Sequence, residues 1–266
     1  MASIAFHKTH VGVVMRQVIA YRPFTATAEA NVLALGGSFL YVHGQACMEI
    51  SMCDTCSFVF TKLRDAPSVD LQGVIDRLHG GISTIGDDII ALLSRGLPAG
   101  EYIATLLEIE PTYTTFGQPD DYFSTEQGGV LEWALRSEGG LHDPRTAYYR
   151  TATTLVEPDA KFFEFVVPLH DPGSARRIDV WQQRMRKGAR PVTLAIAFGD
   201  RLQPATWGGN PPVTTRLCVA HYLLDGHHRF AAAARAGIPI RLLSAYSQGI
   251  WARPRPPHEA VTDTFR

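Results

Sequence analysis

The chain has 266 residues, of which 45% are hydrophobic and 19% are charged, so it is long and apolar enough to bury a substantial core. Its 25 Lys and Arg residues nearly balance 26 Asp and Glu residues, and the net charge of −1 excludes a polyanion partner held by bulk charge. No segment resembles a signal peptide or an apolar span of about 18 residues, and four cysteines are too few for a disulfide scaffold. These features predict a folded, cytoplasmic protein without a membrane partner, and they leave the oligomeric state open.

The first 110 residues predict strands followed by helices. The segments SFLYVHG, CMEISM and SFVFTKL, between residues 38 and 63, are rich in aromatic and β-branched residues and indicate strands. Residues 68–110 have helical spacing interrupted at Gly80-Gly81 and Leu97-Pro98, which predicts about three short helices. Residues 111–160 show no clear period and are expected to connect this N-terminal region to the rest of the chain.

The last third of the chain alternates strands with helices. Strands are predicted at 161–169, 190–198, 217–224 and 238–246, with helices at 174–188 and 230–236. The predicted fold class is therefore α+β, with a mixed-sheet domain at 161–250, a smaller β-then-helical region before it and a flexible tail at 251–266.

The polar stretch DGHHR lies at the junction of a predicted strand and a predicted helix. Gly226 allows close backbone approach, and the helix that follows begins with free N–H groups that attract anions. Arg229 can donate two hydrogen bonds to a phosphate, His227 and His228 can donate or transfer protons, and Asp225 can orient a metal ion or a hydroxyl. The alternative is that Asp225 only caps the helix and the other side chains are ordinary surface groups.

The block DGHHRFAAAARAGIP, together with the order of strands and helices from residue 161 to 246, resembles the ParB/sulfiredoxin-like superfamily. His227 stands where sulfiredoxins carry a nucleophilic cysteine, and the turn differs from the Gly-Glu-Arg-Arg of the chromosome-partitioning branch. The motif is most similar to that of free serine kinases.

The resemblance implies a bound nucleotide, ATP or ADP with Mg²⁺, whose phosphates contact Gly226, His227, His228 and Arg229. It also implies a small hydroxyl acceptor, with Asp225 and His227 in the catalytic site. The base would be Asp171 in PLHDPG, where the kinases have a His-Glu pair, and Asp179 and Glu164 are the alternatives.

Two functions remain open from the sequence. The first is an enzyme, either a small-molecule kinase or a nucleotide hydrolase. The alternative is a non-catalytic, nucleotide-responsive regulatory module that engages a protein or a nucleic acid. The basic segment 174–190 could contact such a partner, but Trp181 is its only aromatic residue, so nucleic-acid binding is not favoured.

A second group of candidate ligands lies near the N-terminus, where His43 precedes Cys47, Cys53 and Cys56. A CxxC turn can present two thiolates to Zn²⁺, and Cys47 and His43 are the nearest candidates for the other two ligands of a structural zinc site. Reduced packing cysteines and a redox pair are the alternatives.

Overall fold

The computed structural model describes residues 16–27, 33–36, 39–51, 59–67, 71–115, 117–118, 121–123, 147–157, 160–202 and 215–247. The large sheet contains β1 (Arg16–Ala26), β6 (Gly100–Ile109), β7 (Thr112–Thr114), β8 (Tyr148–Glu157), β9 (Ala160–Pro168), β10 (Val192–Leu202), β11 (Thr215–Asp225) and β12 (Ile240–Ser247). The small sheet contains β2 (Leu33–Gly36), β3 (Phe39–Val42), β4 (Gln45–Ser51) and β5 (Val59–Lys62). The described helices are α1 (Gln72–His79), α2 (Asp87–Gly96), α5 (Ala175–Arg186) and α6 (His227–Ala236).

The large sheet is mixed, with strand order β1-β6-β12-β10-β11-β9-β8-β7. The β9–β11 and β10–β12 pairs are parallel, and the other neighbouring pairs are antiparallel. This arrangement confirms the predicted α+β class with a mixed sheet. The sheet takes strands from each of the stretches 1–110, 111–160 and 161–250, so these stretches are joined through one set of backbone hydrogen bonds.

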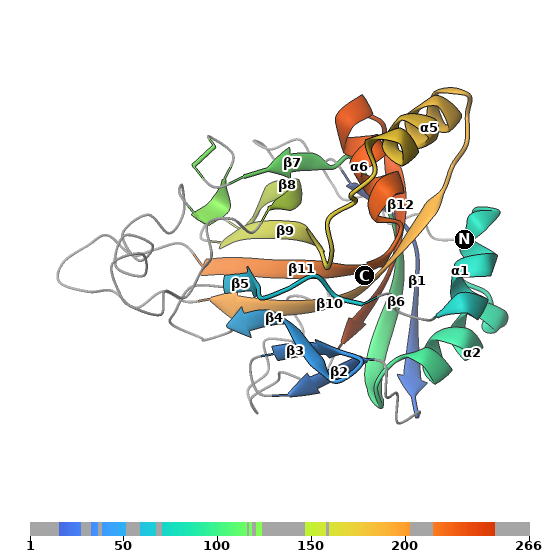
Figure 1. Cartoon of the computed structure of the whole chain (residues 1–266). Helices are drawn as coiled ribbons and strands as arrows, with labels where there is room; N and C mark the ends of the chain where they lie inside the picture. The colour runs from blue at the N-terminus through green and yellow to red at the C-terminus, as the bar shows by residue number, and fades with distance from the viewer. Residues whose placement is uncertain are drawn as a thin grey trace.

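The two faces of the large sheet are covered differently, as Figure 1 shows. The small sheet, α1 and α2 contribute to a core on one face, whereas α5 and α6 pack together on the other. Strand β9 illustrates the alternation, because Phe163 and Phe165 enter the first core while Phe162 and Val166 lie on the opposite face. The ring of Phe60 from β5 lies 5.6 Å from that of Phe165, so the two sheets share one core.

The strands β3, β4 and β5 confirm the three predicted strands of the N-terminal region. The β3–β4 hairpin turns at His43 and Gly44, whose φ values of 48° and 72° fit the two-residue turns that match strand twist. The predicted CDTC turn lies outside the described residues.

The prediction of a third helix before residue 110 is wrong, because Gly100–Ile109 forms strand β6. Residues from Tyr102 to Leu107 are all buried, since β6 lies between β1 and β12 with both faces covered. A continuous apolar run of this kind shows neither the two-residue period of a strand nor the 3.6-residue period of a helix. The sequence pattern therefore cannot distinguish the two. Strand β8 likewise occupies part of the stretch that was expected to be only connecting chain.

From residue 160 on, the observed order of strands and helices confirms the predicted one. Helix α5 begins after Ser174, whose hydroxyl accepts a hydrogen bond from the Arg177 backbone N–H at 3.4 Å. Helix α6 ends at Gly237, which adopts the left-handed conformation typical of this position. Among the described helices, none is both long enough and apolar enough to cross a lipid bilayer.

Candidate functional site

The predicted DGHHR junction forms a tight turn between β11 and α6. Gly226 has a φ of 91°, and a Cβ atom there would lie 2.5 Å from Cγ2 of Thr193, so only glycine fits. The first bond of the helix runs from the Phe230 N–H to the Gly226 carbonyl at 2.8 Å, and no described side chain caps the helix. The backbone N–H groups of the first turn therefore remain available to an anion.

Arg229 is buried beside this turn, with 3% of its surface exposed. Its Nη2 donates to Oδ2 of Asp225, and its guanidinium lies 5.8 Å from the ring centre of Trp181 on α5. Burial lowers the pKa of Arg229, and the Asp225 carboxylate opposes this shift, so the side chain remains a cation. Its second terminal nitrogen, Nη1, is buried and has no hydrogen-bond partner among the described residues.

His227 is the second buried polar group of the turn, with 4% of its surface exposed. Its ring stacks on that of His170 from the β9–α5 connection, with centroids 3.5 Å apart and planes inclined by 28°. Burial lowers the pKa of His227 well below its usual value, and His170, His228 and Lys62 add to the shift. The ring is therefore neutral near pH 7, and its Nε2 has no partner within the described part of the chain.

These two atoms stand out among the polar atoms of the protein core. Only five buried side-chain nitrogen or oxygen atoms of the described residues lack a partner, and two of the five belong to this turn. Leaving such a group unpaired costs about 1–3 kcal/mol, so unpaired groups usually have a partner in the working protein. The turn is therefore the best candidate for a ligand site.

His228 completes the turn on its more exposed side. Burial and the neighbouring Arg177 lower the pKa of His228, while Asp225 acts in the opposite direction. His170 is also held neutral, chiefly by burial. Three imidazoles without positive charge thus lie near one buried guanidinium, and each can gain a proton if an anion binds.

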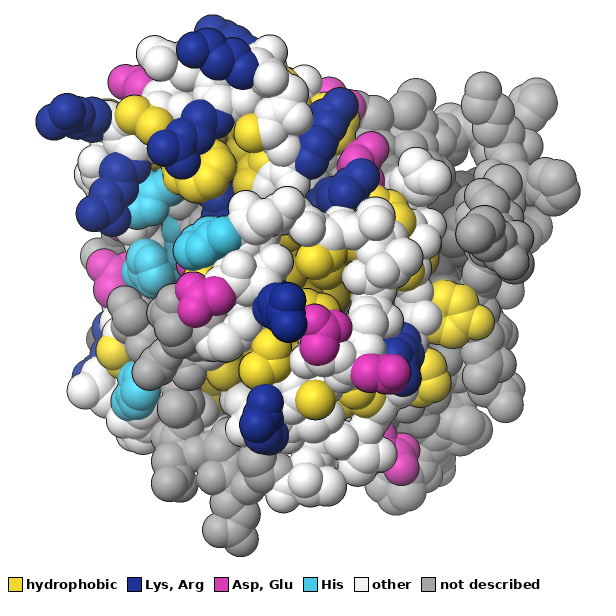
Figure 2. Space-filling model, turned by 90° about the vertical axis from the view of Figure 1, so that its right-hand side faces the viewer, with side chains coloured by type: hydrophobic (Ala, Val, Ile, Leu, Met, Phe, Trp, Pro, Cys, Tyr) yellow, Lys and Arg dark blue, Asp and Glu magenta, His cyan; other side chains and the backbone are white. Residues whose placement is uncertain are grey.

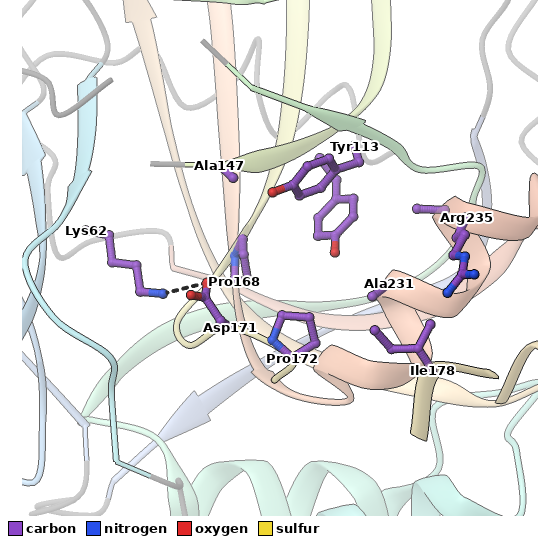
Figure 3. Close-up of a pocket in the computed structure, with 11 residues that line it drawn as sticks. Lys62, Tyr113, Ala147, Pro168, Asp171, Pro172, Ile178, Ala231 and Arg235 are labelled. Carbon is purple, nitrogen blue, oxygen red and sulfur yellow. Dashed lines mark hydrogen bonds and ion pairs between the residues drawn. The ribbon is translucent and has the colours of Figure 1, made fainter. Parts of the chain in front are cut away.

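Asp171, the predicted base, follows His170 in the same connection and is joined to the small sheet. Its Oδ1 lies 3.1 Å from Nζ of Lys62 (Figure 3). The same Nζ lies 2.6 Å from Oδ1 of Asp65. The Asp171 backbone N–H donates to Asp65 at 3.3 Å. Lys62 holds the pKa of the Asp65 carboxyl below its usual value. A cation from β5 is therefore placed beside the carboxylate that the sequence singled out.

Sequence reasoning named neither His170 nor Lys62. His170 precedes Asp171 in PLHDPG, so the comparison with a His-Glu pair contained the signal for it. Lys62 carries no such signal, because only the packing of the small sheet against the large one brings it to the site.

The structure does not bring the two alternative bases to the turn. Asp179 forms an exposed ion pair with Arg235 at 3.0 Å. Glu164 on β9 lies opposite Val219 on β11. Val219 is six residues before Asp225 on that strand, and a strand rises about 3.3 Å per residue, so Glu164 lies roughly 20 Å from the turn. Of the three candidate bases, Asp171 is therefore the one best placed to act at the turn.

Glu164 instead belongs to a buried polar row that crosses the large sheet, here called the sheet row and made of Thr151, Glu164, His221 and Ser244. Thr151 donates to Glu164 at 2.6 Å, Glu164 lies 3.1 Å from Nε2 of His221, and Nδ1 of His221 lies 2.7 Å from Oγ of Ser244. Glu164, His221 and Ser244 are completely buried. Their polar atoms are paired within the protein.

The zinc prediction stays a prediction. Cys47 is buried in the core, its thiol donates to the Gln45 carbonyl at 3.2 Å, and burial raises its pKa. His43 is exposed at the tip of the β3–β4 hairpin, while Cys53 and Cys56 lie outside the described residues. Within the described ranges, no group of three or more His, Cys, Asp or Glu side chains is arranged to hold a metal ion.

The basic residues of α5 give the upper part of one face a positive character. Figure 2 shows Lys and Arg side chains gathered at the height of α5 and α6, with histidines beside them and mixed charges below. The guanidinium of Arg184 lies 5.0 Å from the ring centre of Trp181. Trp181 is a partly buried residue of α5 on the side that faces the turn. This surface adds positive potential around the start of α6.

The comparisons with known proteins leave this site to be judged on its geometry. No protein-family model matches the chain, and no curated protein or solved structure is significantly similar to it.

Proposed function

We propose that the protein binds a nucleotide at the start of α6 and transfers a phosphoryl group from ATP or ADP to a hydroxyl compound. The observation that supports this most is the pair of buried, unpartnered atoms, Nη1 of Arg229 and Nε2 of His227, beside an uncapped helix N-terminus. A guanidinium and a row of backbone N–H groups are the groups that proteins use to bind phosphate. The resemblance of DGHHR to the nucleotide-binding turn of the ParB/sulfiredoxin-like superfamily agrees with this proposal.

The electrostatics of the turn favour an anion over a metal ion held by protein ligands alone. Among the residues that the structure describes, Asp225 is the one carboxylate directly at the turn, and Arg229 already binds one of its oxygens. Mg²⁺ is commonly held by one or two carboxylates together with phosphates and water, so Asp225 fits an ion that arrives with the nucleotide. When bound, the ion would neutralise charge on the transferred phosphoryl group.

Asp171 fits the role of general base in this proposal. In the transfer, the hydroxyl oxygen of the acceptor forms a bond to the terminal phosphorus, and the bridging P–O bond breaks with its electron pair going to the departing nucleotide. The hydroxyl proton passes to the Asp171 carboxylate, whose side chain is 81% exposed and is oriented by Lys62. Asp225 holds Arg229 in place. The other ring nitrogen of His227 donates to the Leu223 carbonyl, so Nε2 takes up a proton when the phosphate binds and then donates to a phosphate oxygen.

The first test is a titration of the purified protein with ATP, ADP and CTP, each with Mg²⁺, in which heat of binding and phosphate release are followed in the same samples. We expect saturable binding that Arg229→Met weakens by about 10- to 100-fold, because a charge-assisted hydrogen bond contributes about 1.5–3 kcal/mol. Arg95→Met, which removes an exposed arginine of α2, is the matched control and should bind as the wild type does.

The outcomes separate the functions. Turnover that disappears in Asp171→Asn with unchanged nucleotide affinity supports phosphoryl transfer or hydrolysis. Binding without turnover, whatever hydroxyl compound is added, points to the regulatory module. If none of the three nucleotides binds, the proposal is wrong.

A further inference from the structure

A pocket of about 670 Å³ opens beside the turn, between α6, the β9–α5 connection, the edge strand β7 and its neighbour β8 (Figure 3). Its floor includes Ala231 and Ala234 of α6 and Ile178 of α5. Pockets that hold drug-sized or nucleoside-sized molecules have volumes of about 300–1,000 Å³, so the space is larger than a free amino acid requires.

The alanine-rich sequence of α6 explains why space remains there. Ala232 and Ala233 are completely buried in the core beneath the helix. Ala231 and Ala234 lie on another face of the helix and line the pocket with minimal side chains. His227 is four residues before Ala231 and therefore lies on that same face, one turn nearer the N-terminus. The pocket therefore lies about one helical turn along α6 from the proposed phosphate site.

The wall opposite α6 is aromatic. The Tyr113 ring packs edge-on against Tyr149, with centroids 5.3 Å apart, and both rings line the pocket. Tyr113 is 55% exposed, although large aromatic side chains are usually covered. A partly exposed aromatic wall facing alanine and isoleucine suits a ligand with an aromatic or aliphatic body.

The charges that line the pocket are already paired. Lys62 is shared between Asp65 and Asp171, and Arg235 lies 3.0 Å from Asp179. Neither lining cation is therefore free to receive the carboxylate of an amino acid. Asp171 pairs with Lys62 through Oδ1, and its exposed carboxylate can accept a further hydrogen bond from a hydroxyl group.

We propose that this pocket binds the acceptor of the reaction, and that the acceptor is an uncharged alcohol or phenol with an aromatic or aliphatic body, not a free hydroxy amino acid. This inference rests on the proposed function, since it places the acceptor hydroxyl at Asp171, beside the nucleotide site. The apolar body lies between Tyr113 and the alanines of α6.

The test uses 2-phenylethanol as the probe and L-serine as the comparison compound, with binding measured by saturation-transfer NMR titration. The wild type should bind 2-phenylethanol in the millimolar range and at least 10-fold more tightly than L-serine. Ala234→Leu fills part of the pocket and should weaken binding by at least 10-fold. Ala91→Leu places the same side chain on an exposed face of α2 and should have no effect.

A second variant, Tyr113→Ala, tests the same pocket in case Ala234→Leu does not fold. Tyr113→Ala removes a ring that is more than half exposed, so the fold should tolerate it, and it should weaken 2-phenylethanol binding by about 3- to 10-fold. The proposal is overturned if L-serine binds as well as 2-phenylethanol, or if neither variant changes the affinity for 2-phenylethanol.

A calorimetric titration with ATP and Mg²⁺ separates failure of this inference from failure of the proposed function. Ala234→Leu should leave ATP affinity unchanged within about 3-fold. If adenosine displaces 2-phenylethanol, the pocket holds the nucleoside of the donor and the acceptor assignment is wrong. If Ala234→Leu weakens 2-phenylethanol binding but no nucleotide binds, the pocket does bind an uncharged alcohol and the proposed phosphoryl transfer is wrong.

Discussion

The large sheet carries two buried histidine clusters that differ in one respect. In the sheet row, both ring nitrogens of His221 have partners, and so do both oxygens of Glu164. At the start of α6, His227 and Arg229 are buried to a similar extent, yet each has one polar atom without a partner among the described residues. Burial of a polar side chain therefore does not mark a candidate ligand site by itself, whereas two unpaired buried atoms in one turn do.

The sheet row can form because the strand between its members carries small side chains. Ala197 of β10 lies opposite His221, and Ala195 lies opposite Ser244 on β12. The imidazole therefore reaches across β10 to the serine hydroxyl. The row joins β8, β9, β11 and β12 through side chains, in addition to the backbone ladder, which gives it a structural role.

The largest expected effect comes from breaking the sheet row. Glu164→Leu leaves Nε2 of His221 unpaired in the core and leaves the Thr151 hydroxyl only its 3.5 Å contact with the backbone carbonyl of residue 164, which should reduce the free energy of unfolding by about 2–5 kcal/mol. For a chain of this length, Tm should fall by roughly 5–15 °C in a calorimetric scan. Glu164→Gln keeps hydrogen-bonding atoms in place and should recover most of the loss.

A calorimetric scan of Arg229→Met compares the contribution of the turn to stability with that of the sheet row. Because Arg229 already has an unpaired buried nitrogen, its loss should change the free energy of unfolding by no more than about 1 kcal/mol. A loss as large as that of Glu164→Leu would show that the turn is as structural as the sheet row.

The next largest effect concerns the glycines at the two ends of α6. Both have positive φ, but a Cβ atom at Gly226 would meet Thr193, whereas a Cβ atom at Gly237 would meet nothing within 4 Å. Gly237→Ala should cost about 1 kcal/mol from backbone strain alone, and Gly226→Ala should cost about 1–2 kcal/mol more. Chemical denaturation measures both. Equal losses would mean that the turn has room for a side chain.

A similarly small effect is expected from His227, as a pH dependence of stability. Its pKa is lowered by burial, so the folded protein keeps the ring neutral while the unfolded chain protonates it below about 6.5. The unfolded state then binds more protons, and stability is lost as the pH falls below 6.5. His227→Phe should gain about 1 kcal/mol relative to the wild type between pH 7.5 and 5.5, measured by urea denaturation without nucleotide. A constant difference across this range would contradict the neutral assignment.

Local patterns predicted some parts of the molecule and not others. The strand, glycine and alanine-rich helix around residue 226 were predictable, because each preference there agrees with the final structure. Strand β6 was not, because its two buried faces remove the alternation that marks a strand. Strand β1 pairs with β6, which lies more than 70 residues further along the chain, so its own sequence contains little of the information that places it.

The sequence by itself determined the chemistry of the turn, since Asp225, Gly226 and Arg229 are neighbours whose spacing already specifies a tight turn, a helix start and a cation. Only the tertiary structure decided what surrounds it. The stacking of His170 on His227 and the approach of Lys62 to Asp171 bring together residues far apart in the chain. Burial then decided which polar atoms found partners, because pairing depends on how the two sheets and the helices pack and not on the order of residues along the chain.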